Sequence, residues 1–165
     1  MLSVLDLSGC LQLGDAGICS IVTLCGRLET FIAKFSPASD ASCHALSKCS
    51  ILASLDLSGS LPTRKGLVAL TPLAPSLRRL SLSKCTVVND SNLCELLRLL
   101  PIIEYIDIRG CPSVSYSTIL LLAKLAPHAA IKHSVDHGVA LATAVEVVAF
   151  IQPISDRNDR GFPPK

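Results

Sequence analysis

The sequence predicts an α/β solenoid, in which short strand–helix units stack so that their parallel strands lie on a concave side and their helices lie outside. A motif of the form Leu-x-x-Leu-x-Leu-x-x-Cys recurs in units that start at residues 2, 28, 52, 77 and 103. Within the units, apolar residues are first spaced two apart, as in a half-buried strand, and then three or four apart, as in a helix. A unit of about 25 residues cannot cover its own apolar face, so neighbouring units must stack into one core.

The first unit shows both halves of the pattern. Its strand motif consists of Leu2, Leu5, Leu7 and Cys10. The helical spacing follows at Ile18, Ile21, Val22 and Cys25. Asp15, and Asp90 in the fourth unit, fit helix starts, where a side-chain oxygen accepts hydrogen bonds from free backbone N–H groups.

The second and third units are weaker copies of the strand motif. The second begins at Leu28 and continues with Phe31 and Ala33 before Ser36. The third has Leu52, Leu55 and Leu57, with Ser60 at the last position. Serine therefore replaces cysteine in both.

The fourth and fifth units repeat the full motif. The fourth has Leu77, Leu80, Leu82 and Cys85, and the fifth has Ile103, Ile106, Ile108 and Cys111. Helical spacing follows at Leu93, Leu96, Leu97 and Leu100 in one, and at Ile119, Leu122 and Leu125 in the other.

The C-terminal region predicts a degenerate capping unit over residues 129–151. A weak strand is expected at 130–134, followed by an apolar helix from Gly138 to Ile151 whose only charge is Glu146. This helix either packs on the fifth unit as a cap or binds a partner. Residues 152–165 are polar and are expected to form a flexible tail, so residues 1–151 form a single domain.

The repeats resemble leucine-rich repeats of the cysteine-containing subtype, which is found after the F-box in F-box/leucine-rich-repeat proteins. The matching stretches are LSVLDLSGCLQLGDAGICSIVTLC, LASLDLSGS, LRRLSLSKCTVVNDSNLCELL and IEYIDIRGCPSVSYSTILLLA. The resemblance covers residues 2 to 128 and implies a horseshoe arc with helices on the convex face. It also implies a role as a substrate receptor of a cullin-type ubiquitin ligase, although the N-terminus shows no F-box.

Composition excludes several classes of protein. Half of the 165 residues are hydrophobic, which is too many for a disordered chain. The net charge is +2, without a basic run, so nucleic acid is not expected as a partner. The apolar windows fall short of the roughly 20 residues that a membrane-spanning helix needs. There is no secretory signal either, so we expect an intracellular location, cytoplasmic or nuclear, and eight reduced cysteines.

The cysteines and histidines predict neither a metal site nor a catalytic centre. Cys10, Cys85 and Cys111 share one repeat position and are interpreted as small buried side chains. His133 and His137 are interpreted as part of an exposed connector, because AIKHSVDHG does not hold a helical period. No nucleophile, phosphate-loop or dinucleotide motif is present. We therefore expect a protein without enzymatic activity or cofactors.

The predicted functional surface is the concave face, where the strand residues between core positions point away from the core. The residues expected to contact a protein partner are Asp6, Lys34, Asp56, Arg79, Tyr105, Asp107 and Arg109. Tyrosine and arginine are enriched at binding hot spots. The alternative is that these side chains are only solvated.

The expected function is a non-catalytic protein–protein interaction module. In the setting that the resemblance implies, it recognises a substrate or an adaptor in a ubiquitin-ligase-like complex. The alternative is a structural subunit held permanently in a larger assembly. The first unit has no capping element before it, so we expect further repeats or a docked chain at that end.

Overall fold

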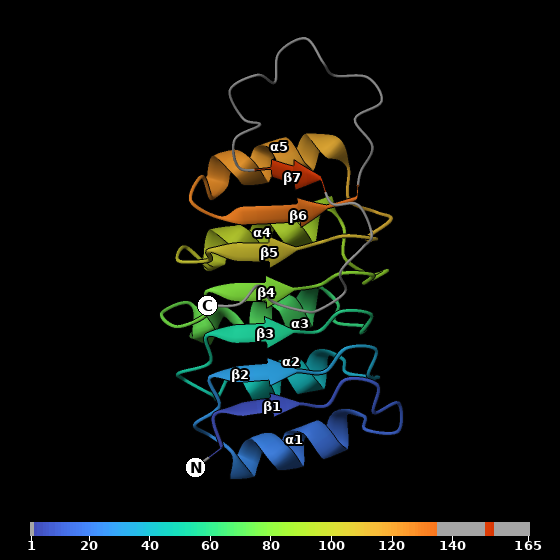
Figure 1. Ribbon diagram of the computed structural model, residues 1–165, viewed down its shortest axis with the longest axis vertical. Coiled ribbons are helices and arrows are strands. Elements are labelled where there is room, and N and C mark those ends of the chain that lie inside the picture. The colour runs from blue at the N-terminus through green and yellow to red at the C-terminus, as the bar shows by residue number, and fades with distance from the viewer. Residues whose placement is uncertain (1, 135–150, 154–165) are drawn as a thin grey trace.

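The computed structural model describes residues 2–134 and 151–153 of the chain, and this part is a single α/β arrangement (Figure 1). Its strands are β1 (Val4–Asp6), β2 (Thr30–Ile32), β3 (Ser54–Asp56), β4 (Arg79–Ser81), β5 (Tyr105–Asp107), β6 (Ala130–His133) and β7 (Ile151–Pro153). Its helices are α1 (Asp15–Leu24), α2 (Asp40–Leu46), α3 (Arg64–Ala69), the 3₁₀ turn η1 (Thr71–Leu73), α4 (Asp90–Leu99) and α5 (Tyr116–Leu125).

The strands form one sheet in chain order, and every neighbouring pair is parallel. The pairing is in register with the repeat, since Leu5, Phe31 and Leu55 lie opposite one another across β1 to β3. We call residues 2–27, 28–51, 52–76, 77–102 and 103–128 units 1 to 5. Each contributes one strand and one α-helix, as the sequence pattern predicts.

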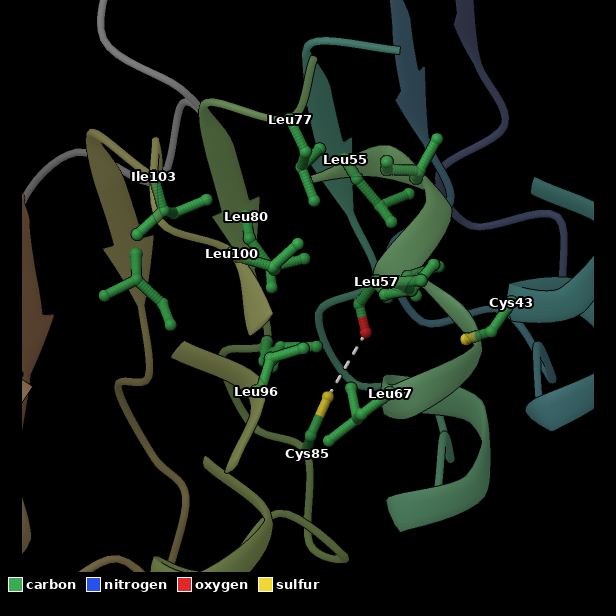
Figure 2. Packing of buried hydrophobic residues seen from close by; sticks show 14 of the residues in the cluster. Cys43, Leu55, Leu57, Leu67, Leu77, Leu80, Cys85, Leu96, Leu100 and Ile103 are labelled. Carbon is green, nitrogen blue, oxygen red and sulfur yellow. Dashed lines mark hydrogen bonds between the residues drawn. The ribbon is translucent and has the colours of Figure 1, made fainter. Parts of the chain in front are cut away.

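The helices pack against one side of the sheet, and successive helices contact each other along the stack (Figure 1). The core lies between the two layers. Leucines from the strands, such as Leu55 and Leu80, meet leucines from the helices, such as Leu67 and Leu96 (Figure 2). All four of these side chains are buried.

The turn after each of the first five strands uses one left-handed residue at an equivalent position. Gly9, Gly59 and Gly110 have φ values of 75°, 70° and 68° there, and Phe35 and Lys84 have 54° and 59°. Glycine adopts this conformation without the steric cost that other residues carry. The turn therefore explains why the motif favours glycine directly before its cysteine or serine.

The helix starts differ from the prediction. Asp15 does not cap its own helix: its carboxylate accepts hydrogen bonds from the N–H and hydroxyl groups of Ser39 and Ser42 in the next unit. Asp90 likewise accepts from the Ser115 N–H. Helix α4 is capped by Asn89, which forms a reciprocal capping box with Asn92. These aspartates thus join successive units.

The cysteine position also joins successive units. The Cys85 thiol donates to the Leu57 carbonyl of the preceding unit at 3.2 Å (Figure 2), and the Cys111 thiol donates to the Leu82 carbonyl at 3.1 Å. Both side chains are buried, as predicted, but Cys10 is exposed because no preceding unit covers it within the described residues. All eight cysteines lie in the described part and are free thiols.

The C-terminal region agrees with the sequence in part. Strand β6 lies where the weak strand was expected, but its His133 is buried, so the prediction of an exposed connector is wrong there. His133 occupies the position of Leu57 and Leu82 in the repeat. The predicted helix and His137 fall on residues 135–150, outside the described residues. Ile151 begins β7, which also takes in the first two residues of the expected tail.

Candidate functional site

The candidate site is the side of the sheet away from the helices, which we call the strand face. In β1 to β6, the first and third residues of the strand point to this side, because the second residue faces the core. Neighbouring strands lie about 4.8 Å apart. In the described strands β1 to β6, the third position carries the row Asp6, Ile32, Asp56, Ser81, Asp107 and Lys132.

Ion pairs and hydrogen bonds hold the charged groups of this face. The Lys34 ammonium group lies 3.7 Å from Asp56 Oδ2, and an Arg109 guanidinium nitrogen lies 2.6 Å from Asp107 Oδ2. The backbone N–H of Ser58 donates to Asp56 at 2.9 Å. The face is thus a mixed-charge surface rather than an acidic one.

An aromatic group lies beside these charges. Arg79 and Tyr105 are opposite each other in the β4–β5 pairing. The Lys132 ammonium group lies 5.3 Å from the centroid of the Tyr105 ring, within range of a cation–π interaction. Four types of recognition group (guanidinium, phenol, ammonium and carboxylate) therefore lie on three adjacent strands.

The middle of the strand face is less accessible than strand alternation alone implies. Asp56 is only 1% exposed, and Tyr105 and Asp107 are also buried. Burial raises the pKa of Asp56, and the nearby Asp107 raises it further, while Ser58 and Lys34 act in the opposite direction. Burial likewise raises the pKa of Tyr105. These groups are positioned side chains rather than freely solvated ones.

The predicted site residues do not all come together. Lys34, Asp56, Arg79, Tyr105, Asp107 and Arg109 lie on or directly after the neighbouring strands β2 to β5. Asp6 lies on the terminal strand β1, is exposed and bonds to its own neighbour Ser8. It is therefore separate from the central group.

Sequence reasoning missed a shallow groove of about 680 Å³ on the helix side, between α3 and α4. It is lined by Arg64, Asp90, Ser91, Cys94, Glu95 and Arg98. Arg64 donates to both carboxylate oxygens of Glu95, at 2.6 and 2.8 Å, so these two charges satisfy each other. The signal in the sequence was that α3 begins with Arg64, where α1, α2 and α4 begin with aspartate.

Within residues 2–134 and 151–153, no three or more His, Cys, Asp or Glu side chains converge so as to hold a metal ion. Nor does that part contain a helix long and apolar enough to cross a membrane.

Comparison with known proteins does not extend this picture. No protein-family model matches the chain, and no curated protein gives a significant match.

Proposed function

We propose that the chain is a non-catalytic protein-binding module and that the strand face contacts the partner. One observation carries the proposal: β4, β5 and the turn after β5 place the partly exposed side chains of Arg79 and Arg109 on one face, beside the buried Tyr105 and Asp107. Tyrosine and arginine are enriched among the few residues that contribute most of the binding energy at protein interfaces. Their fixed positions lower the entropic cost of binding.

For the finer fold class, we propose a leucine-rich-repeat solenoid of the cysteine-containing subtype. Its support is the recurrence of one strand and one helix per unit, with Cys85 and Cys111 donating to the preceding unit at the same repeat position. The proposed setting is recognition of a substrate or adaptor in a ubiquitin-ligase-like complex. That setting is supported by the resemblance of the repeat motif.

The second candidate function is a structural subunit within a larger assembly. It is favoured by exposed apolar side chains in unit 1, at the end of the stack, among them Leu2, Leu11 and Leu24. In that case the chain is held through its end rather than through the strand face.

The test compares affinity purifications read by mass spectrometry. The bait carries Arg79→Ala and Tyr105→Ala on the strand face. The matched control carries Arg64→Ala and Glu95→Ala, an exposed ion pair on the helix side. We expect one set of partners to disappear with the strand-face change and to persist with the control, and ligase components in that set support the proposed setting.

Thermal denaturation of each variant shows whether it is still folded, so that a loss of partners can be assigned to the changed surface. If the strand-face variant loses its cooperative transition, the milder pair Arg79→Lys and Tyr105→Phe replaces it. A fixed set of partners that persists with every variant contradicts binding through the strand face and favours the structural subunit.

A further inference from the structure

The outer side of unit 1 leaves exposed the apolar positions that the other units bury. Leu2 is 48% exposed, whereas the equivalent residues Leu28, Leu52, Leu77 and Ile103 are all 0% exposed. Leu5 and Leu7 are only partly buried, although the corresponding residues of units 3 and 4 are 0% exposed. Leu13 is also partly buried, whereas its equivalent in unit 4, Val88, is 0% exposed. Leu24 at the end of α1 is 85% exposed, against 38% for its equivalent Leu125 at the end of α5. The apolar contact surface between units therefore continues beyond β1.

The backbone N–H groups at the start of β1 lack the hydrogen-bond acceptors that a preceding unit provides elsewhere in the stack. Between units 3 and 4, the N–H groups of Arg78 and Arg79 donate to the Ala53 carbonyl. The equivalent N–H groups in unit 1 belong to Ser3 and Val4 and point to the outer edge of β1. Within the described residues, no strand pairs with that edge.

The thiol of Cys10 is a third independent sign. Its equivalents Cys85 and Cys111 are buried and donate to a carbonyl of the preceding unit. Cys10 is exposed. On the outer side of unit 1, the apolar side chains, the backbone N–H groups and the Cys10 thiol thus lack the packing and hydrogen-bond partners that a preceding unit provides in the rest of the stack.

From these three observations we infer that the outer edge of unit 1 is a docking surface for one further strand–helix unit of the same repeat, laid parallel to β1. The surface continues the established interface between units, and this continuity specifies the occupant. In a dimer with two-fold symmetry, the two β1 strands would pair antiparallel. That pairing does not place a carbonyl near Cys10 as the parallel pairing of the repeat does. The inference does not depend on the strand face and so stands or falls separately from it.

The first experiment supplies such a unit by fusion. A copy of residues 52–76, which contains no cysteine, is placed directly ahead of Leu2 in the full chain. It brings the equivalents of the Leu57 and Ala53 carbonyls to Cys10, Ser3 and Val4. We expect alkylation of Cys10 by N-ethylmaleimide to slow at least tenfold, and hydrogen exchange at Ser3 and Val4 to slow as well.

The matched control carries Leu55→Asp and Leu57→Asp in the grafted copy only, so that the added unit has the same length but cannot pack. A folded fusion in which Cys10 reacts as fast as in this control overturns the inference. Concentration-dependent protection of Cys10 in the ungrafted chain, with a dimer in sedimentation, also overturns it and assigns the edge to a second copy.

The second experiment uses the unfused chain, so it holds even if the fusion misfolds. A photo-crosslinking amino acid replaces Leu24 at the exposed end, and a control replaces Leu61, an exposed residue in the loop before α3. We expect Leu24, and not Leu61, to crosslink to peptides that carry the Leu-x-x-Leu-x-Leu pattern. Crosslinks to peptides of unrelated pattern, or equal crosslinking from both positions, contradict the inference.

Discussion

Alanine substitutions at three glycines separate the free-energy cost of a left-handed backbone from the cost of a steric clash. Gly9 and Gly59 lie in turns that follow a strand, and Gly26 follows helix α1. Gly59 has φ of 70°, and a Cβ there would lie 2.3 Å from Cδ1 of Phe35. Gly9 has φ of 75° but nothing within 4 Å of such a Cβ. Gly26 has neither a left-handed backbone nor a close neighbour. The three substitutions therefore add the same methyl group but differ in backbone conformation and in the space around that group.

The expected magnitudes follow from these contacts. A left-handed backbone costs a non-glycine residue about 1–2 kcal/mol, so Gly9→Ala should lower the free energy of unfolding by about that much. Gly59→Ala should add the loss of the Phe35–Lys84 cation–π contact, which spans 5.4 Å, for a total of about 1.5–3 kcal/mol. Gly26→Ala should be neutral or stabilise by up to about 1 kcal/mol, because alanine restricts the unfolded chain.

Urea denaturation followed by far-ultraviolet circular dichroism measures the three values directly. The expected order of stability is Gly26→Ala, then Gly9→Ala, then Gly59→Ala. Equal stability of all three variants would refute the reasoning, since it would mean that the turn does not require a left-handed residue.

Three further predictions concern the core, the thiols and the acid response. In chemical denaturation, Leu82→Ala should lower the free energy of unfolding by about 2–5 kcal/mol and Asp6→Ala by less than about 0.5 kcal/mol. Equal losses would contradict the assignment of which strand residues face the core. Native-state alkylation read by peptide mass spectrometry should modify Cys10 and spare Cys43 and Cys85, because burial raises the pKa of both buried thiols to about 12; rapid labelling of Cys85 would contradict its burial. Burial raises the pKa of Asp15, but hydrogen bonds from Ser39 and Ser42 outweigh this effect, so the pKa in the folded protein is lowered. The ionised carboxylate of Asp15 therefore contributes to folding stability above pH about 4. This contribution is lost as the pH falls through the lower pKa of the folded state. The stability difference between Asp15→Ala and the parent chain should thus shrink in acid, and a constant difference would exclude this linkage.

The repeat spacing was sufficient to predict strands β1 to β5 and their order, but not β7, which lies where the end of a helix and a tail were expected. Apolar residues two apart recur at nearly constant intervals, and parallel stacking in register is the arrangement that buries all of them together. The confirmed helices α1, α4 and α5 follow from the three-or-four spacing that comes next. These features are local, so a single sequence contains them.

Contacts between units could not be predicted in the same way. Asp15 and Asp90 were assigned to their own helix starts because capping is a local rule, whereas their carboxylates reach serines about 25 residues ahead. Likewise, Cys10 matches Cys85 in motif but not in burial, because burial depends on the preceding unit.

The strand face shows the same limit. Alternation along a strand predicts which way Asp56 points, but it does not predict how enclosed the side chain is or that Lys34 pairs with it. The groove between α3 and α4 arises from side chains of two units, and no linear motif signals it.

The measurement that most directly tests the central claim is the affinity for a purified partner, determined by isothermal titration calorimetry. Arg79→Ala with Tyr105→Ala should weaken binding by roughly 30-fold or more, as the loss of hot-spot residues does, while Arg64→Ala with Glu95→Ala should leave the dissociation constant unchanged. Unchanged affinity in the first variant and a large loss in the second would place recognition on the helix side and contradict the account.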